Sequence, residues 1–445
     1  MSFPRYAQYK DSGVEWLGEV PAHWNTLRLK TLLYETDERA GTTDAELLGL
    51  SKSLGVVRRS ELDQGAAESN DYSKYKLVHP GQLVMNKMQA WNGVFGLSAN
   101  FGMVSPDYAT FHFFEPELGS YLSSLFRTDV VAGVCFTRCR GMGTAFLRIN
   151  TGDFLDIKVP LPPPEEVQAI AAFLDRETAK IDELVAEQRN LIELLKEKRQ
   201  ALISHAVTKG LNPDAPMKDS GVEWLGEVPA HWNTTRLKFS TTHIIDCPHE
   251  TPSYSPDGEY LVVRTADVFA GTLNLHNAYR LDQAEYENRT RRGKLLPEDV
   301  VYGREGERWG YAAIVPDEVP LCLGQRMMQF RVRKNICPRF IMWQLNADSI
   351  YRQGQVDTVG ATAPHVNIST IANYILTEPP PCEQYEIAIN LDVATAQVDD
   401  LMAEAETTIT LLQERRTALI SAAVTGKIDV RERMSVQSAA EMEVA

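Results

Sequence analysis

The sequence predicts an α+β protein in which two globular α/β domains are separated by two long antiparallel coiled-coil helices. Three observations predict this pseudo-two-fold tandem duplication. A short segment near the start recurs almost unchanged, a longer segment recurs with heptad periodicity, and the two stretches between them share little sequence. A chain of 445 residues corresponds to about three average domains, so we expect more than one hydrophobic core.

The short repeat covers residues 10–30, KDSGVEWLGEVPAHWNTLRLK, and residues 218–238. Twenty of the 21 positions are identical, and Leu27 opposite Thr235 is the one change. We call these two stretches the frame segments. Because the same sequence recurs at an offset of 208 residues, the chain is interpreted as a tandem duplication.

The long repeat covers residues 162–208 and 379–425, which align without gaps and match at 26 of 47 positions. Apolar residues recur at steps of four and three, a mean spacing of 3.5 that is typical of a coiled coil. The proline runs predict the helix starts, Gly210 and Gly426 predict the stops, and about 43 residues give a helix of about 65 Å. The first predicted stripe is Leu174, Thr178, Ile181, Val185, Gln188, Ile192, Leu195, Arg199, Leu202 and Ala206. The second is Leu391, Thr395, Val398, Met402, Ala405, Ile409, Leu412, Arg416, Leu419 and Ala423.

A single helix of this kind would leave its apolar stripe in water, so each stripe needs a partner. We favour packing of the two copies on each other, because one chain supplies two matching stripes. The polar residues Thr178, Gln188 and Arg199 on the stripe are expected to fix the register at some cost in stability. The alternative is two independent helices, each packed on its own domain.

The inserts, 31–160 and 239–378, have short apolar runs with glycine and proline between them, which indicates mixed α/β structure. We expect strands at 82–85, 111–114, 299–302 and 328–332, and short helices at 118–126 and 340–345. The predicted division is a first globular domain at 1–160, a spacer helix at 161–212, a second globular domain at 213–378, a second spacer helix at 379–430 and a disordered tail at 431–445.

The composition, 44% apolar and 24% charged, is that of an ordinary globular protein. No apolar run reaches the ~20 residues of a membrane span, and the start lacks a signal-peptide pattern, so a cytoplasmic location without a membrane partner is expected. The six scattered cysteines indicate reduced thiols and no metal site. The net charge is −15, but residues 379–445 carry 5 basic and 12 acidic side chains, so local basic surfaces elsewhere leave nucleic-acid binding open.

Catalytic signatures are missing from the sequence. It has no GxxxxGK[ST] loop, no HExxH or GxSxG motif, and no Asn/Asp-Pro-Pro-aromatic stretch of an amino-methyltransferase. The glycine-rich stretch 303–310 carries charges that suggest a hairpin or contact loop instead of a dinucleotide site. We therefore expect the chain to bind and not to catalyse.

Both inserts instead contain clusters of cationic, amide and aromatic side chains. Arginine can pair with guanine O6 and N7, and asparagine or glutamine with adenine N6 and N7, each at about 1–3 kcal/mol of discrimination. The candidates in the first insert are Asn86, Lys87, Gln89, Trp91, Arg138, Arg140 and Arg148. The candidates in the second are Arg291, Arg292, Arg304, Arg308, Trp309, Gln325 and Arg326.

Six stretches carry a family resemblance: DSGVEWLGEVPAHW, HPGQLVMNKMQAWNGVFGLS, SPDY at 105–108, PLPPPEEVQAIAAFLD, LLKEKRQALISHAVTKG and TGKIDVRE. With these motifs, from residue 10 to about residue 432, the chain resembles the specificity subunit of type I restriction–modification systems. The resemblance implies two target-recognition domains that each read one half of a bipartite double-stranded DNA sequence. It also implies spacer helices that bind two modification subunits.

By the same resemblance, S-adenosylmethionine and the adenine N6-methylation chemistry belong to those modification subunits. ATP, Mg²⁺, translocation and cleavage belong to recruited restriction subunits, and this chain binds no cofactor itself. The family's Gly/Thr element before each proline run matches 143–145 and 360–362, which implies that Thr144 and Thr362 lie near DNA. Asn150 and Asn367 follow at equivalent positions, and Asn367 is included among the candidates.

Two hypotheses from other classes stay open. The chain could be a stand-alone DNA-modifying enzyme, a methyltransferase or nuclease whose motifs are unrecognisable. It could also be a scaffold that joins two partner proteins and never touches DNA. A methyl-transfer assay on the isolated chain separates the first from a specificity subunit, and pull-down with and without duplex DNA separates the second.

Overall fold

The computed structural model describes residues 3–43, 45–62, 71–141, 147–306, 308–317, 319–356 and 365–431. The chain divides into two compact units, residues 1–187 with 408–445 and residues 188–407. Helix α4 (Pro164–Lys209) begins in unit 1 and ends in unit 2, and α10 (Pro381–Val424) does the reverse. Both helices begin at the predicted proline runs. Because the units divide the long helices, the predicted five-part domain division stays a prediction.

Unit 1 contains a four-stranded antiparallel sheet with the order β4-β11-β8-β9, together with helices α1 and α2. The strands expected at 82–85 and 111–114 and the helix expected at 118–126 are confirmed as β8, β11 and α1. The strands of unit 1 are β1 (Tyr9–Asp11), β2 (Glu19–Pro21), β3 (Asn25–Arg28), β4 (Leu33–Thr36), β5 (Leu48–Ser51), β6 (Gly55–Arg58), β7 (Lys76–Val78), β8 (Leu83–Asn86), β9 (Phe95–Leu97), β10 (Gly102–Val104), β11 (Tyr108–Phe113) and β12 (Lys158–Leu161). Its shorter helices are η1 (Leu29–Thr31), η2 (Arg59–Glu61), η3 (Ala90–Asn92), α1 (Leu118–Phe126), α2 (Asp129–Arg138) and α3 (Thr151–Leu155).

Unit 2 has a sheet of the same topology, β16-β24-β21-β22, although its insert shares little sequence with the first. The strands expected at 299–302 and 328–332 and the helix expected at 340–345 are confirmed as β21, β24 and α7. The strands of unit 2 are β13 (Met217–Asp219), β14 (Glu227–Pro229), β15 (Asn233–Arg236), β16 (Thr241–Asp246), β17 (Tyr260–Val263), β18 (Val268–Phe269), β19 (Thr272–Leu273), β20 (Tyr279–Leu281), β21 (Val300–Gly303), β22 (Ala312–Ile314), β23 (Leu321–Leu323), β24 (Met327–Val332) and β25 (Ile375–Glu378). Its shorter helices are α5 (Leu237–Ser240), η5 (Thr265–Asp267), α6 (Gln283–Thr290), α7 (Pro338–Leu345), α8 (Asp348–Val356) and α9 (Ile368–Ala372).

The common topology follows from the hydrophobic pattern and not from identity of residues. The central strands β8 and β21, 217 residues apart, both begin with three consecutive buried side chains. A run buried on both faces of a sheet needs cover on each side, and any apolar residue of suitable size satisfies that requirement. The two inserts can therefore differ in sequence and still form the same sheet.

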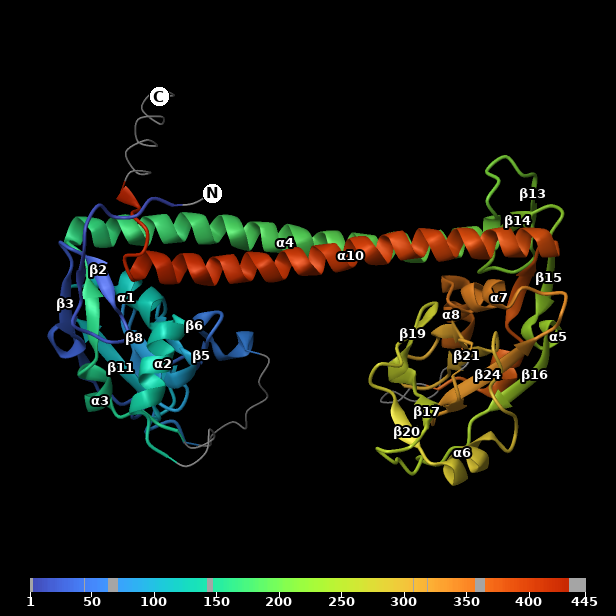
Figure 1. The fold of residues 1–445 in the computed structure, drawn as a ribbon, viewed down its shortest axis with the longest axis horizontal. Coiled ribbons are helices and arrows are strands. Elements are labelled where there is room, and N and C mark those ends of the chain that lie inside the picture. Colours follow the sequence, from blue (N-terminus) through green and yellow to red (C-terminus); the bar gives the residue numbers. More distant parts are fainter. Residues whose placement is uncertain are drawn as a thin grey trace. The chain divides into compact units, whose positions relative to one another are not determined.

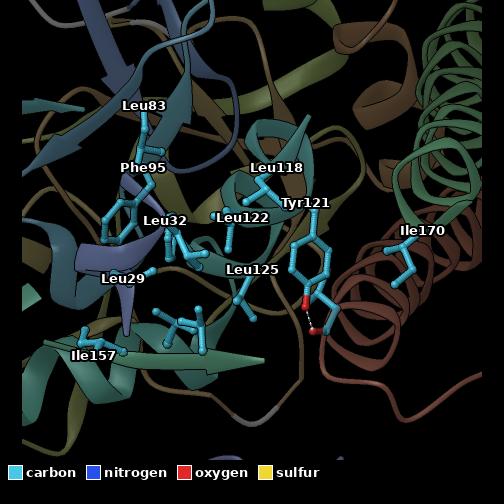
Figure 2. Packing of buried hydrophobic residues seen from close by; sticks show 14 of the residues in the cluster. Leu29, Leu32, Leu83, Phe95, Leu118, Tyr121, Leu122, Leu125, Ile157 and Ile170 are labelled. Atoms are coloured by element: carbon cyan, nitrogen blue, oxygen red, sulfur yellow. Dashed lines mark hydrogen bonds between the residues drawn. The ribbon is translucent and has the colours of Figure 1, made fainter. Parts of the chain in front are cut away.

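The core of unit 1 continues from the sheet through α1 to the long helices. Figure 2 shows Leu83 and Phe95 near Leu122 and Leu125 of α1, with Tyr121 extending toward the long helices. The Tyr121 hydroxyl donates to the carbonyl oxygen of Val424 at 2.9 Å. In unit 2, Thr377 donates to the carbonyl oxygen of Val207 at 2.6 Å, the position equivalent to Val424. Each unit thus holds the last turn of one long helix with a hydroxyl group.

The long helices pack on each other, and the hypothesis of two independent helices is wrong (Figure 1). In unit 1 the first part of α4 packs against the last part of α10, through residues such as Ile181 and Leu419. In unit 2 the last part of α4 packs against the first part of α10, through residues such as Ile203 and Leu391. The helices are therefore antiparallel, as the sequence predicted.

Two ion pairs between the long helices occupy equivalent positions of the repeat. Arg199 contacts Asp399 at 2.8 Å in unit 2, and Arg416 contacts Asp182 at 2.9 Å in unit 1. Arg416 and Asp399 lie 217 residues after Arg199 and Asp182, so each copy supplies its arginine to the aspartate of the other copy. This reciprocal pairing is the pattern of an interface with two-fold symmetry. Thr178, also expected to fix the register, instead donates to the carbonyl oxygen of Leu174 in its own helix.

Each frame segment ties the start of one long helix to the end of the other. His23 lies 2.7 Å from Glu166 in the first turn of α4, and His231 lies 2.8 Å from Glu383 in the first turn of α10. Trp232 also donates to Glu383 at 2.8 Å. In unit 1 the hydroxyl of Tyr6, upstream of the frame, donates to Glu166 instead.

The glycines that end the helices lie against the two frame tryptophans. An added Cβ at Gly426 would lie 2.4 Å from Pro21 and 3.1 Å from Trp24, and one at Gly210 would lie 3.1 Å from Trp232. Both glycines have positive φ, 71° and 76°, in the left-handed conformation that ends many helices. The frame segments therefore need glycine at both helix ends, for conformation and for space.

Replacing Gly426 by alanine should destabilise unit 1 by about 3 kcal/mol, because left-handed strain and overpacking against Pro21 both contribute. The matched substitution Gly221→Ala, at φ 72° with no atom within 4 Å of the added Cβ, should cost only about 1 kcal/mol of strain. Equilibrium denaturation of the two variants measures the difference. Equal effects of the two substitutions would show that the contact with Pro21 has no role.

Candidate nucleic-acid interface

Equivalent strand ends in the two units bring polar side chains to one edge of each sheet. In unit 1, β4 and β8 end where β11 begins, and Asn86 lies opposite Tyr108. In unit 2, β16 and β21 end where β24 begins, and Asp246 and Tyr302 both lie opposite Met328. We call these places the first and second polar edge.

The residue after each central strand is held in the same way at both polar edges. The carbonyl oxygen of Lys87 accepts from the amide of Ile149 at 3.1 Å, and that of Arg304 accepts from the amide of Val366 at 3.2 Å. Both contacts are equivalent by the offset of 217 residues. Segments close to the predicted Gly/Thr elements therefore return to the polar edges, although Thr144 and Thr362 themselves lie outside the described residues.

Asn150 and Asn367 occupy equivalent places, as the sequence predicted. Each is the exposed residue at the start of a short helix, α3 or α9. Neither side chain caps its helix, and the Asn150 amide lies 3.4 Å from the carboxylate of Asp153. The amide of Asn367 remains a candidate for contact with DNA.

Carboxylates neutralise the lysines below the first polar edge. Lys87 lies 3.4 Å from Glu35, and the buried Lys76 lies 3.7 Å from Glu35 and 3.1 Å from Asp37. A hydrogen bond from Arg39, with a further one from Lys76, holds the pKa of Asp37 below its usual value. Lys87 is four-fifths buried, so the structure gives this candidate an internal partner.

The remaining amide and aromatic candidates of unit 1 shape the turn after β8. Asn86 accepts from the amide of Met88 at 3.0 Å, and Trp91 donates to the carbonyl of Met88 at 2.8 Å. The Trp91 ring meets Phe136 of α2 edge to face at 6.3 Å. Gln89 is half-buried in the same turn. These contacts fix the turn. Within the described residues, the structure gives no hydrogen bond for the side chain of Gln89.

Arg138 ends α2, Arg140 and Arg148 follow it, and the three side chains differ in their contacts within the protein. Arg138 donates to the carbonyl of Asp153 at 2.9 Å, and Arg148 forms an ion pair with Asp107. Arg140 is bridged to Arg148 through the backbone, and its side chain is 76% exposed with Asp153 at 3.4 Å. Arg140 is therefore the cation of this group that is most open to an external anion.

Two of the DNA-binding candidates in unit 2, Trp309 and Arg304, have buried side chains. Trp309, 6% exposed, belongs to the core of unit 2, and the partly exposed Tyr351 stacks on its ring at 4.4 Å. Arg304, 7% exposed, contacts Glu305 at 2.7 Å and Asp246 at 3.4 Å. Its guanidinium also lies 3.3 Å from His249.

Four of the candidate arginines of unit 2 are exposed: Arg291, Arg292, Arg308 and Arg326. Arg292 donates to the carbonyl of Asp246 at 3.3 Å, and Arg308 lies over the Phe269 ring at 4.8 Å. Arg326, at φ 73°, has a side chain 46% exposed with Glu305 at 3.8 Å. Gln325 donates to the carbonyl of His249 at 3.1 Å, so Gln325 and Arg326 belong to one turn at the second polar edge.

Sequence reasoning missed the carboxylates and the histidine of this edge. Asp246 ends β16, Glu305 follows Arg304, and His249 lies 2.8 Å from Asp246. The available signal for Asp246 was a charged residue at the end of the apolar pair Ile244 and Ile245. His249 had no signal, because its contact with Arg304 comes from a segment more than 50 residues away.

Neither a metal centre nor a membrane segment occurs in the part of the chain that the structure describes. Within the described ranges no three His, Cys, Asp or Glu side chains are grouped to hold a metal ion. Within the same ranges no helix is long and apolar enough to cross a membrane. The chemistry that these edges offer is hydrogen bonding and charge.

The sequence is similar to a known family model and to several characterised proteins. A model of the type I restriction modification DNA specificity domain matches residues 134–194 and 253–411. The type I restriction enzyme EcoKI specificity subunit of Escherichia coli K12 is 21% identical over 409 residues, 85% of this chain and 83% of that protein. The MjaVIII specificity subunit of Methanocaldococcus jannaschii is 22% identical over 306 residues, 66% of this chain and 68% of that protein.

Two solved structures share the fold. A chain in a structure on complex assembly and conformational transition of the type I restriction–modification system superposes with a TM-score of 0.66 at 17% identity, over 91% of this chain and 98% of that one. The HsdS subunit from Thermoanaerobacter tengcongensis gives 0.51 at 16% identity, over 94% and 99%. With the duplicated frame, the antiparallel helices and two sheets of one topology, the chain belongs to the DNA specificity subunits of type I restriction–modification systems.

Proposed function

We propose that this chain reads an asymmetric, bipartite site in double-stranded DNA, one half at each polar edge. The observation that supports the proposal best is that two sheets of equal topology present different side chains at equivalent edges. Equal scaffolds with unequal side chains suit two unlike half-sites, because base edges in the major groove are distinguished by the donors and acceptors opposite them.

The exposed cations suit this role better than the buried ones. Arg140 at the first edge and Arg326 at the second have side chains 76% and 46% exposed. Arginine can bind guanine in two places or pair with a phosphate, and the excess of carboxylates elsewhere does not prevent such local contacts. Arg304 and Lys87, with internal carboxylates, are better suited to shape the edges than to read bases.

The chain is proposed to direct adenine N6 methylation and DNA cleavage that partner subunits carry out. In this proposal it binds no cofactor, and S-adenosylmethionine, ATP and Mg²⁺ act in the modification and restriction subunits. The missing catalytic motifs in the sequence support this division of labour. Methyl transfer by the isolated chain would contradict it.

Two copies of a modification subunit are the proposed partners of the helix pair. Leu184 and Leu411 are 44% and 59% exposed in unit 1, and Leu194 and Leu401 are 54% and 48% exposed in unit 2. The repeat relates Leu184 to Leu401 and Leu194 to Leu411, so both units present the same pair of leucines. In the heptad these positions flank the apolar stripe on one side, where a partner helix can cover them.

Replacing Leu184 and Leu411 by lysine should remove one modification subunit and leave the one at Leu194 and Leu401. Exposed apolar side chains add little to the stability of the isolated chain, but their burial in a complex contributes about 2 kcal/mol each. Native mass spectrometry of the purified complex gives the stoichiometry, and the single variant Ala186→Lys, exposed on the other side of the apolar stripe of the same helix, is the control. A ratio of two modification subunits to one chain in the double variant would reject this docking surface.

Long-read mapping of methylated adenines in a host with and without this gene tests the proposed function. We expect methylation at two unlike half-sites separated by a fixed number of unspecified base pairs. A single contiguous palindrome, or no change in methylation when the gene is removed, would reject the proposal. If pull-down with the modification subunits succeeds but no DNA is bound, the chain is a scaffold instead.

A further inference from the structure

A buried arginine connects two segments of the second polar edge on the side that faces the protein interior. Arg289 lies on α6, is 4% exposed, and donates to three backbone carbonyl oxygens. Its Nε donates to Leu323 at 2.9 Å, and its two terminal nitrogens donate to Glu250 at 3.0 Å and Pro248 at 3.2 Å. Its ion-pair partner, Glu285, lies 3.8 Å away on the same helix. Carbonyl groups, at shorter distances than this carboxylate, are therefore its main partners.

These carbonyl groups belong to two segments that are remote in sequence. Pro248 and Glu250 lie in the loop that follows β16, and Leu323 is the last residue of β23. A second tie joins the same segments, since Gln325 donates to the carbonyl of His249 at 3.1 Å. The loop at 247–251 and the turn at 324–326 thus form one structure, fixed on its inner side by Arg289.

Both segments present candidate reading groups to solvent. His249 and Arg326 have side chains 53% and 46% exposed, and Gln325 lies beside them. Arg326 keeps its positive φ of 73° only while the surrounding contacts hold it there, because a residue with a Cβ is strained in this conformation. A turn under strain moves when its anchors are removed.

We propose that Arg289 is a positioning residue for base discrimination at the second half-site, an inference that rests on the proposed function. It contacts no DNA; it sets the distance between the loop with His249 and the turn with Gln325 and Arg326. The planar guanidinium directs its donors along fixed directions, whereas a lysine ammonium is a single point on a flexible stem. Lysine at this position keeps the charge and cannot reach all three carbonyl groups.

The first polar edge is held differently, as far as the described residues of unit 1 show. The buried cation there, Lys76, pairs with the carboxylates of Glu35 and Asp37 on and beside β4. Substitution of Arg289 should therefore affect one half-site only. That confinement distinguishes positioning from a general decrease in stability, which would weaken reading by the whole chain.

The test uses the full chain with its modification subunits in a host whose methylated adenines are mapped. Arg289→Lys should reduce the discrimination between correct and incorrect bases at one half-site about tenfold, because one misplaced base contact corresponds to about 1–3 kcal/mol. Discrimination at the other half-site should stay unchanged. Glu285→Gln, which removes the carboxylate and keeps the three carbonyl bonds, should leave the pattern unchanged. Arg352→Lys, on the surface of the same unit with a side chain 65% exposed, is the matched control.

Each outcome decides the inference. Relaxation confined to one half-site, with thermal unfolding close to that of the parent chain, supports it. An unchanged pattern, an equal relaxation at both half-sites, or an effect of Glu285→Gln as large as that of Arg289→Lys overturns it. If Arg289→Lys and the uncharged Arg289→Gln both unfold unit 2, the role is structural and the inference is rejected. If the parent chain with its modification subunits directs methylation to no bipartite site, the proposed function itself is rejected, whatever the effect of Arg289→Lys.

Discussion

Arg199→Asp should lower the free energy of unfolding of unit 2 by about 3 kcal/mol, because it places a second carboxylate against Asp399 on a mostly buried face. Arg199 is 14% exposed, donates to the carbonyl of Ala270 at 2.8 Å and lies 5.8 Å from the Trp343 ring centre. The double variant Arg199→Asp with Asp399→Arg should recover about half of this free energy, since the ion pair returns and the bond to Ala270 does not. Equilibrium denaturation of the single and double variants measures the coupling.

The equivalent pair in unit 1 is the internal control. Arg416 and Asp182 are 32% and 56% exposed, so Arg416→Asp should cost only about 1 kcal/mol. Equal effects in the two units would mean that burial does not decide the strength of these ion pairs. No coupling in the double variant would mean that the helix register depends on the apolar stripe alone.

Arg140→Ala and Arg326→Ala should each reduce discrimination at one half-site by about 10-fold or more, about 1–3 kcal/mol, and spare the other half-site. Arg140 lies at the first polar edge and Arg326 at the second, and both side chains are open to solvent. Fluorescence anisotropy with the mapped site, and with each half-site scrambled in turn, measures the two effects separately.

The salt dependence of the same measurement separates base contacts from phosphate contacts. If Arg140 or Arg326 bound only a phosphate, its replacement by alanine would weaken binding to every duplex equally and lower the slope against salt by about one unit. Arg352→Ala, outside both polar edges, should change neither quantity. Equal weakening at both half-sites by one substitution would contradict the assignment of one edge to each half.

The repeat made most of the architecture predictable. Heptad spacing identified the stripe of α4, where Ile181 and Leu195 are buried, and the proline runs located both helix starts. Two copies of one stripe in one chain favoured an antiparallel pair, which is confirmed. These features depend on local periodicity and on residues close in sequence, so they can be read from the sequence itself.

The candidate site was less predictable, because composition does not distinguish an exposed cation from a buried one. Arg289, Arg291 and Arg292 lie within four residues of each other, yet the first binds three carbonyl groups inside the protein and the other two are exposed. Trp309, a DNA-binding candidate in the sequence, is buried and stacks on Tyr351 from a helix about 40 residues later. Thr144 and Thr362 lie outside the described residues, and their proximity to DNA stays a prediction.

The duplication, the long helices with their apolar stripes and the family resemblance were all evident from the sequence. Three features became visible only in the folded chain: the inserts share one sheet topology, Arg199 and Arg416 each pair with the aspartate of the other copy, and some cations stay open at the polar edges. The physical reason is the range of the interactions: periodic burial is encoded within a few turns of chain, whereas the environment of a charge is set by carbonyl and carboxylate groups that folding brings from distant segments.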